Sequence, residues 1–426
     1  MTQQATQAQT ALSTFYDAMK KAGAAELRGA AWERFSGKGL PNRRVESWRY
    51  TDLRQALGAI APLADGLRAA PVLPAPHGAR LVIVDGAFRP DLSAVTALPA
   101  GVTVQSLRDL LASGDAAALK ALAPEGPGGE DAVLALNAAL MEDGVVLRVA
   151  PGAQVSEPLE LYVMSSASAQ STFTRSLAII GDGATATLIE TYVGGGATQE
   201  NHALSLSVGA GAKLAHITHI TAANAGAVRV LSLLATLGAS SALASTSLIE
   251  GGGLLRRQIF ALLDGEAADI SLNGASLLRN RDHADTTVVV EHAQPNGKSR
   301  ERFRYILDEA STGVFQGCVK VRQAAQKTDG AMQSKALLLS DNATMNNKPE
   351  LEIFADDVAC GHGATCGRLD KDQLFYLNAR GVPPTEAESL LLLGFAGDVF
   401  SEIADEALRD ELTARVADWL ASRKDA

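Results

Sequence analysis

Short runs of alternating apolar and polar residues fill the middle of the chain, from about residue 144 to residue 368. They follow turns of small residues, and the clearest of them cover 185–193, 213–220, 241–249 and 268–277. Because successive side chains of a β-strand point to opposite faces, this alternation predicts strands with one buried face.

The turns that precede these runs recur at a nearly constant interval. They are 28, 29 and 27 residues apart, counted at Gly181, Gly209, Gly238 and Gly265. No helix-like segment lies between them, so the period predicts a β-solenoid in which each coil pairs with its neighbours. A β-sandwich with coincidental spacing is the alternative. The period loosens after Gly265, and we expect residues 292–302 to leave the coil before further turns follow.

Helical patterns flank this core. Residues 1–78 are interpreted as an N-terminal helical region that ends in a proline-rich connector, because proline cannot continue a helix. Residues 79–143 are interpreted as a transitional α/β region with a short strand at 81–84 and one helix-like segment at 106–123. The β-solenoid core is assigned to residues 144–368.

The C-terminal region, residues 369–426, has three helical signals. The first covers residues 370–379, with Gly381 as its stop. Thr385 and Glu388 predict a capping box in front of the next helix. A third helix is expected after Asp405, because apolar residues recur at helical spacing and make one buried stripe. These residues are Leu408, Leu412, Val416, Trp419 and Leu420.

The charge balance limits the partners. The 426 residues include 38 basic and 48 acidic side chains, a net charge of −10. Nucleic acids and anionic membranes attract basic surfaces, so neither is expected as a partner. The N-terminus lacks a basic segment followed by an apolar run, and no apolar stretch approaches the roughly 18 residues of a membrane span. We therefore expect a cytoplasmic protein.

The three cysteines are too few, and odd in number, for a disulfide framework, and they fit a reducing compartment. Two of them, Cys360 and Cys366, lie with His362 within seven residues, the densest group of soft and borderline metal ligands in the chain. On one extended strand all three face the same side, but the two cysteines are then roughly 20 Å apart.

Three interpretations of this group remain open. Its glycines could bend the strand so that all three residues bind one zinc ion. Alternatively, one or two of them, His362 foremost and Cys360 more weakly, form half of a site that another chain completes. In the third interpretation, Cys360 and Cys366 are small core residues and His362 makes an ordinary hydrogen bond.

The remaining candidates are weaker. His216 and His219 are three apart in a predicted strand, so they point to opposite faces. His283 and His292 lie in polar, turn-rich segments and are expected at the surface. Cys318 is expected to pack in the interior, because the sequence names no neighbour that would lower the pKa of its thiol. No Walker-type phosphate loop, nucleophile elbow or paired-histidine zinc motif occurs.

Several segments resemble one known family. These are ESWRYTDL at 46–53, NNKPELEIFADDV at 346–358, CGHGAT at 360–365 and QLFYL-x-x-RG at 373–381. Together and in this order they resemble the SufB/SufD family of iron–sulfur cluster assembly proteins. The chain looks more like the SufD type, because residues 340–344 and 361–365 lack the cysteine and the glutamates of the corresponding SufB segments.

This resemblance implies a right-handed parallel β-helix between N- and C-terminal α-helical regions, in a protein that is not itself an enzyme. It implies a scaffold subunit that pairs with a SufB-like paralogue through the β-helix and passes clusters to recipient apoproteins. A SufC-like ATPase is expected to dock on the C-terminal helices, with Arg380, Leu391 and Phe395 as candidate contacts.

The family histidine at the interface between the two paralogues corresponds to His362, where it is proposed to help bind iron or the nascent cluster. No cofactor is expected to bind stably to this chain alone; iron or an iron–sulfur cluster would be shared with the SufB-like partner. An isolated chain could instead form a homodimer.

Two competing classes of function are kept. β-Helices also host polysaccharide lyases and hydrolases, which would use acids such as Asp282 and Asp285 beside bases such as Arg279 and Arg281. A secretory signal would favour that hypothesis, and none is visible. In the other class the chain is a plain structural partner and His362 is inert.

Overall fold

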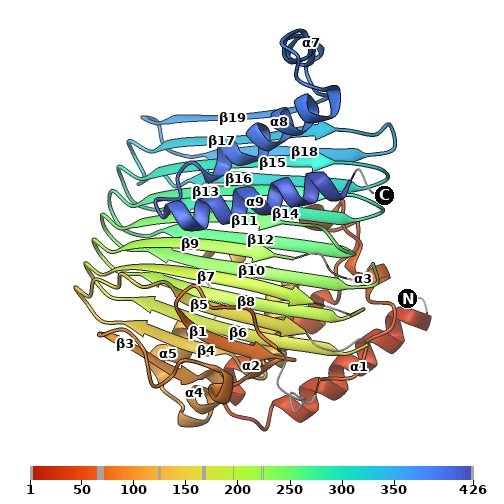
Figure 1. Cartoon of the computed structure of the whole chain (residues 1–426). Helices are drawn as coiled ribbons and strands as arrows, with labels where there is room; N and C mark the ends of the chain where they lie inside the picture. Colours follow the sequence, from red (N-terminus) through yellow and green to blue (C-terminus); the bar gives the residue numbers. More distant parts are fainter. Residues whose placement is uncertain are drawn as a thin grey trace.

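The structure is a computed structural model that describes residues 3–64, 72–122, 126–165, 169–194, 196–221, 223 and 225–423. Its centre is a parallel β-solenoid built from two facing sheets, with helices at both ends of the chain packed on its outside (Figure 1). The predicted mainly β solenoid with flanking helical regions is therefore confirmed.

Strands of the two sheets alternate along the chain. The first sheet has ten strands, in the order β19-β17-β15-β13-β11-β9-β7-β5-β1-β2. They are β1 (Ala79–Val84), β2 (Ala87–Phe88), β5 (Leu159–Ser165), β7 (Thr185–Gly194), β9 (Lys213–Ile220), β11 (Ala242–Ile249), β13 (Asp269–Leu278), β15 (Lys298–Leu307), β17 (Asp329–Leu338) and β19 (Ala359–Gly367).

The second sheet has nine strands, in the order β18-β16-β14-β12-β10-β8-β6-β4-β3. They are β3 (Val102–Ser106), β4 (Val145–Val149), β6 (Ser171–Ile180), β8 (Gln199–Val208), β10 (Val228–Leu237), β12 (Leu254–Leu263), β14 (His283–His292), β16 (Thr312–Val321) and β18 (Thr344–Ile353). Each turn of the solenoid thus contributes one strand to each sheet.

The marker glycines are required because successive turns stack very closely. A Cβ atom at Gly265 would lie 2.0 Å from the backbone nitrogen of Ala239 in the turn below, and one at Gly181 would lie 2.5 Å from that of Pro151. Any side chain there would force the turns apart, so the glycine period reports the stacking of the coils.

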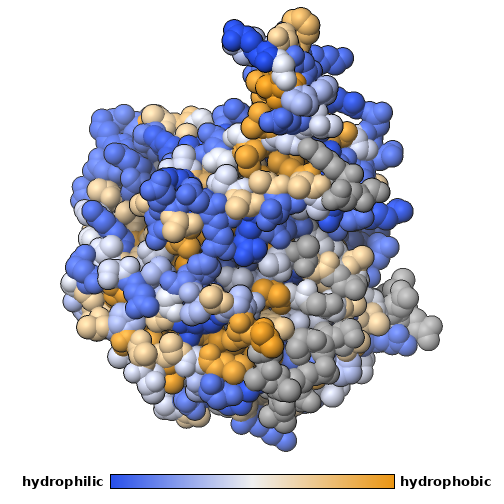
Figure 2. Space-filling view, viewed as in Figure 1, coloured by the Kyte–Doolittle hydropathy of each residue, from blue (hydrophilic) through white to orange (hydrophobic). Residues whose placement is uncertain are grey.

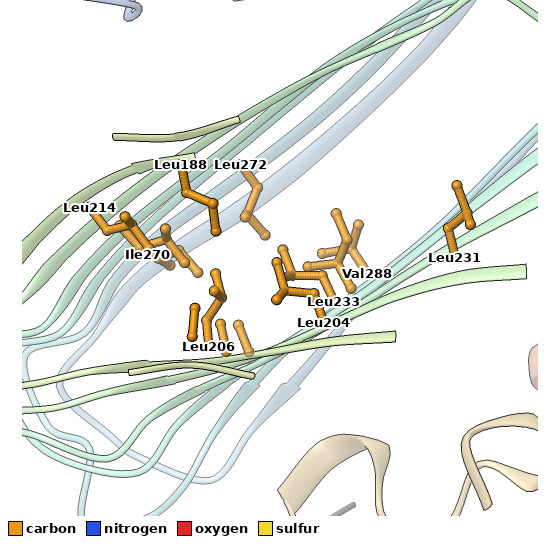
Figure 3. Packing of buried hydrophobic residues seen from close by; sticks show 14 of the residues in the cluster. Leu188, Leu204, Leu206, Leu214, Leu231, Leu233, Ile270, Leu272 and Val288 are labelled. Carbon is orange, nitrogen blue, oxygen red and sulfur yellow. The ribbon is translucent and has the colours of Figure 1, made fainter. Parts of the chain in front are cut away.

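Between the two sheets lies a long apolar core. Figure 3 shows leucine, isoleucine and valine side chains from both sheets pointing toward one another. The labelled members are Leu188, Leu204, Leu206, Leu214, Leu231, Leu233, Ile270, Leu272 and Val288. Burying one such side chain stabilises the fold by roughly 1.5–3 kcal/mol, and the parallel register repeats this contribution at every turn.

Two groups of helices cover the outer faces of the sheets. The N-terminal group includes α1 (Gln3–Met19), α2 (Ala25–Lys38), α3 (Leu53–Ala56), α4 (Leu107–Ser113), α5 (Ala116–Leu122) and α6 (Ala132–Leu140), with short 3-10 turns η1 (Glu46–Trp48), η2 (Pro90–Leu92) and η3 (Gly126–Gly128). Within this group, α1, α2 and α6 form an apolar cluster with Phe173, Val228 and Val230 of the nine-stranded sheet.

The C-terminal group consists of α7 (Lys371–Ala379), α8 (Pro384–Gly397), η4 (Asp398–Phe400) and α9 (Glu406–Ser422). Here α8, η4 and α9 pack on the ten-stranded sheet, and α9 buries the predicted stripe from Leu408 to Leu420. In contrast, α7 has no buried residue and projects beyond the end of the solenoid (Figure 1). Among the described helices, none combines the length and apolar character needed to cross a bilayer.

Three local predictions are wrong. The single helix expected at 106–123 is two helices, because the chain turns at Gly114 with φ of 71°. Residues 292–302 do not leave the coil; they end β14 and begin β15. The capping box is absent: α8 begins at Pro384, its N-cap Pro383 makes no side-chain cap, and Glu388 instead lies 3.4 Å from Arg423.

Candidate functional site

One end of the solenoid is closed and the other is open. At the N-terminal end the short strands β2 and β3 pair antiparallel with their neighbours and finish the sheets. At the C-terminal end β18 and β19 are the last strands, and most of their residues are exposed. Their unpaired backbone groups form a ready template for strands of another chain.

The edge of β19 has little protection against such pairing. Natural edge strands are commonly guarded by charged side chains or proline. The neighbouring β18 carries Lys348, Pro349 and Glu350, whereas β19 reads ACGHGATCG and has no such residue. The open end is therefore suited to strand addition on the β19 side.

The three predicted ligands lie on this last strand and in its inward-facing row. By register, Cys360, His362 and Cys366 stand opposite Gly330, Met332 and Ala336 of β17. Met332 and Ala336 belong to the solenoid core, so the three residues continue that core at the open end. Nothing stands above them in the described residues, because β19 is the edge of its sheet.

Cys360 and His362 differ in environment. Cys360 is half-buried against the core, and this burial raises the pKa of its thiol. His362 is exposed. Its imidazole is therefore accessible to a second chain that approaches the open end.

Cys366 is separated from this pair. The strand from Ala359 to Gly367 pairs with β17 in unbroken register, so its glycines do not bend it. Within the described residues, no three histidine, cysteine, aspartate or glutamate side chains gather closely enough to hold a metal ion. The straight β19 does not bring the three side chains together as the glycine-bent zinc site of the sequence analysis requires. The alternative of two core cysteines is also wrong for Cys366, which is exposed.

A polar group that the sequence analysis missed lies in the interior beneath Cys360 and His362. Glu301 of β15 is fully buried and stands opposite Met332, which in turn stands opposite His362. Ser299 of β15 stands opposite Gly330, which in turn stands opposite Cys360. The Ser299 hydroxyl and Nε2 of His292 share a hydrogen bond of 3.1 Å. A one-residue error in the sheet register would place these side chains outside, so only a correct strand pairing could have found them.

The other predicted candidates have structural roles. The expected surface position of His292 is wrong, since this residue is fully buried, and burial lowers the pKa of its imidazole to about 4. His216 is buried between Glu190, 2.8 Å away, and Ser245, 2.9 Å away. His219 faces the other side of β9 and lies 2.8 Å from Glu250.

Cys318 is not in the interior as expected. It lies on the outer face of β16, half-buried in a groove below Val45 and Ser47. Burial raises the pKa of its thiol to about 11, so at neutral pH it is a thiol and a poor nucleophile.

The residues of the lyase-like alternative are engaged in holding the fold. Asp285 is buried in an ion pair of 2.5 Å with Arg256, and it accepts a hydrogen bond from Thr51. Arg279 donates to Ser422 of α9. These contacts tie the N- and C-terminal helical regions to the solenoid, and Arg279 and Asp282 also line a surface pocket beside α9.

The C-terminal arm carries exposed apolar side chains. Phe375 and Tyr376 of α7 are 73% and 57% exposed, and Leu390 of α8 is 48% exposed. Figure 2 shows apolar residues along this projecting arm. Of the predicted contacts, Arg380 is exposed and stacks on Tyr376, whereas Leu391 and Phe395 are half-buried, the latter against the chain's own core.

Two family models match the chain. The model of the SUF system FeS cluster assembly SufBD core domain matches residues 162–395, and that of the SufBD protein N-terminal region matches residues 73–161. The core match covers every turn from the end of β5 to β19 and continues into the C-terminal arm.

Individual relatives agree with these matches. The iron–sulfur cluster assembly protein SufD of Escherichia coli is 30% identical over 396 residues, which cover 90% of each chain. A SufBD family protein of Synechocystis is 29% identical over 412 residues, covering 92% of this chain and 89% of the relative. SufD of Bacillus subtilis is 29% identical over 303 residues, covering 67% and 66%.

Proposed function

Because this chain belongs to the SufBD family of iron–sulfur cluster assembly proteins, we propose that it is a non-catalytic scaffold subunit in a complex with a SufB-like paralogue and a SufC-like ATPase. The complex would assemble clusters in the cytoplasm and pass them to recipient apoproteins. Relatives named as SufD support this assignment of the type of subunit.

The observation that carries the proposal is the open end of the solenoid. The unguarded edge of β19 suits pairing with strands of the paralogue. Such pairing would bring ligands of the partner against His362 and Cys360 and complete a site that this chain only half provides. Iron or the nascent cluster is the cargo of this shared site, and its soft ligand set suits iron and sulfide chemistry.

The ATPase is assigned to the C-terminal arm. The chain has no phosphate-binding loop, so a nucleotide-driven step needs a partner. The arm offers the exposed apolar side chains Phe375, Tyr376 and Leu390, which a partner surface would cover.

The proposal is tested with His362→Ala in the complex purified with both partners. Removing the imidazole should leave folding and assembly intact, because the side chain is exposed, and should lower the iron and sulfide content several-fold. Metal and sulfide analysis of the purified complex measures this. The matched control is Thr365→Ala. Thr365 lies three residues after His362, on the opposite face of β19, so this change should not alter the iron and sulfide content. Unchanged cluster content in His362→Ala would contradict the proposal.

A further inference from the structure

Glu301 is an unusual residue for the place it occupies. Its side chain lies inside the solenoid, in a column between Leu272 and Met332. Both carboxyl oxygens are buried, and neither has a hydrogen-bond partner in the described part of the chain. An unpartnered buried carboxyl destabilises a fold, and an apolar side chain of similar size would pack there at lower cost. Packing alone does not explain this residue.

Its protonation state follows from this environment. Burial raises the pKa of Glu301 to about 8, and the nearby Ser299 hydroxyl and Arg300 offset the effect only in part. Arg300 points outward, where its guanidinium lies 2.5 Å from Asp329. The other titratable groups of this region are Cys360 and the neutral His292; the surrounding strands otherwise contribute apolar side chains such as Phe303 and Val319. At neutral pH the carboxyl is therefore mostly uncharged.

The position of Glu301 relates it to the open end. It lies two strands below His362, a distance of about 10 Å at the usual strand spacing, and Met332 stands between them. In the next column Gly330 leaves the space between Ser299 and Cys360 free of a side chain. A Cβ at Gly330 would lie 3.3 Å from the Ser299 hydroxyl and 3.5 Å from the Cys360 sulfur. The interior below the candidate ligands is fully buried, with Glu301, Ser299 and His292 as its polar members, so a charge there is more weakly screened than at the surface.

We propose that Glu301 balances the charge of an iron ion at the open end: when Fe²⁺ binds to Cys360 and His362, the buried carboxyl releases its proton and the carboxylate stabilises the cation from below. This inference rests on the proposed function of the open end. It assigns Glu301 to loading of ferrous iron and gives it no direct bond to the metal.

The charges and protons balance. The S–H bond of Cys360 breaks, an Fe–S bond forms, and one proton leaves to solvent. The O–H bond of Glu301 breaks and a second proton leaves. The charge of Fe²⁺ is then met on this chain by one thiolate and one carboxylate, and the ligating imidazole of His362 adds no charge. This chain releases up to two protons for each iron bound, and up to one without Glu301; protons released by ligands of the partner add equally to both counts.

The test is an anaerobic titration of Fe²⁺ into the complex of this chain with its SufB-like paralogue, followed by calorimetry in two buffers of different ionisation enthalpy. A net charge of +1 about 10 Å away, at an effective dielectric constant of about 20, lowers the pKa of the carboxyl from about 8 to about 7. Glu301→Gln should therefore release about half a proton fewer at pH 7 and bind iron about twofold more weakly there, and its loss of affinity should grow to about tenfold above pH 9. Above pH 9, where the carboxyl is already ionised, the difference in proton count should vanish.

Controls separate this inference from other effects. Glu301→Met removes the acid without leaving a buried polar group, so it should fold stably and behave like Glu301→Gln in iron binding. Glu352→Gln changes a solvent-exposed carboxylate on β18 and should not alter either measurement.

Two results overturn different claims. If His362→Ala abolishes iron binding but both Glu301 variants match the wild type in affinity and proton count, the role of Glu301 is wrong and the proposed function stands. If the wild-type complex binds no iron, or binds it equally well in His362→Ala, the proposed function fails and the role of Glu301 fails with it.

Discussion

At the scale of single residues, the two cysteines of β19 have different surroundings despite equivalent positions in the alternation. Cys360 packs against the solenoid core, while Cys366 is exposed near the end of the strand. The difference arises because β19 is the last strand of its sheet. No strand covers its outer edge, so each of its residues is buried only by the contacts it makes with the solenoid on the side of β17.

This difference predicts that replacing the two cysteines by alanine changes the free energy of unfolding by unequal amounts. Cys360→Ala should lower the free energy of unfolding by about 1 kcal/mol, because it removes a packed sulfur atom, whereas Cys366→Ala should change it by only a few tenths. Urea unfolding of the isolated chain measures both. Equal losses would contradict the packing described for Cys360.

The burial of Glu301 predicts a dependence of stability on pH. Its pKa is near 8 in the folded chain and near its ordinary value of 4.5 in the unfolded chain, so the folded state holds the proton more tightly. The contribution of Glu301 is fully present below about pH 4.5 and is lost as the pH rises through 8.

The free energy of unfolding of the wild type, relative to Glu301→Gln, should therefore fall by an amount on the order of a few kcal/mol between pH 5 and pH 8.5. Urea titrations at several pH values measure this difference, in which the other titrating groups largely cancel. A constant difference would mean that the carboxyl is not held neutral in the folded chain.

His362 could be recognised from the sequence and Glu301 could not. The density of ligand types around His362 is a local property, visible without a fold. Glu301 stands among Ser299, Arg300 and Arg302, and such a segment reads as a polar loop. Its outward arginines pair with Asp329 and Glu402, partners distant in sequence, so only the sheet register reveals that Glu301 is inside.

At the scale of elements, one sheet was far easier to predict than the other. The predicted runs correspond to β7, β9, β11 and β13 of the ten-stranded sheet. Strands β8, β10 and β12 of the other sheet are buried on both faces for most of their length, because α1, α2 and α6 cover them. A strand buried on both faces does not need polar residues at every second position, so it lacks the alternation of apolar and polar residues by which a strand is recognised in a sequence.

The C-terminal helices divide into a structural part and an exposed part. Helix α9 and η4 bury Trp419 and Phe400 against the solenoid, so removing everything after Gly381 would strip a layer of the core. Such a truncation cannot test partner binding cleanly, whereas substitutions on α7 can, because no α7 residue is buried.

We therefore expect the double variant Phe375→Ala and Tyr376→Ala to weaken binding of the SufC-like ATPase at least tenfold, since exposed aromatic residues dominate many interfaces. Its melting temperature should stay within about 1–2 °C of the wild type. Pull-down with the purified ATPase measures the first effect. Val95→Ala, at another exposed apolar residue, is the control. Undiminished binding with a native melting temperature would exclude α7 from the interface.

At the scale of the whole molecule, the solenoid is closed at one end and open at the other. The regular spacing of the glycines predicted that the turns stack, because close contact between neighbouring turns requires a glycine at each of these positions. The position of the last turn depends on which strand has no further neighbour in its sheet, and no local sequence pattern indicates which strand that is. The open end and the ligands on it therefore became a site only when the complete order of strands was known.

The open end also predicts that the isolated chain is an incompetent scaffold. An iron–sulfur cluster needs several thiolate or imidazole ligands around it, and a straight β19 keeps Cys360 and Cys366 roughly 20 Å apart. The purified chain, reconstituted anaerobically with iron and sulfide, should show little stable cluster absorption. The same treatment with the SufB-like and SufC-like partners present should give a strong signal, because ligands of the paralogue would complete the shell. A lone chain that held one cluster per molecule, and lost it in each of Cys360→Ala, His362→Ala and Cys366→Ala, would contradict the straight strand and restore the site within one chain.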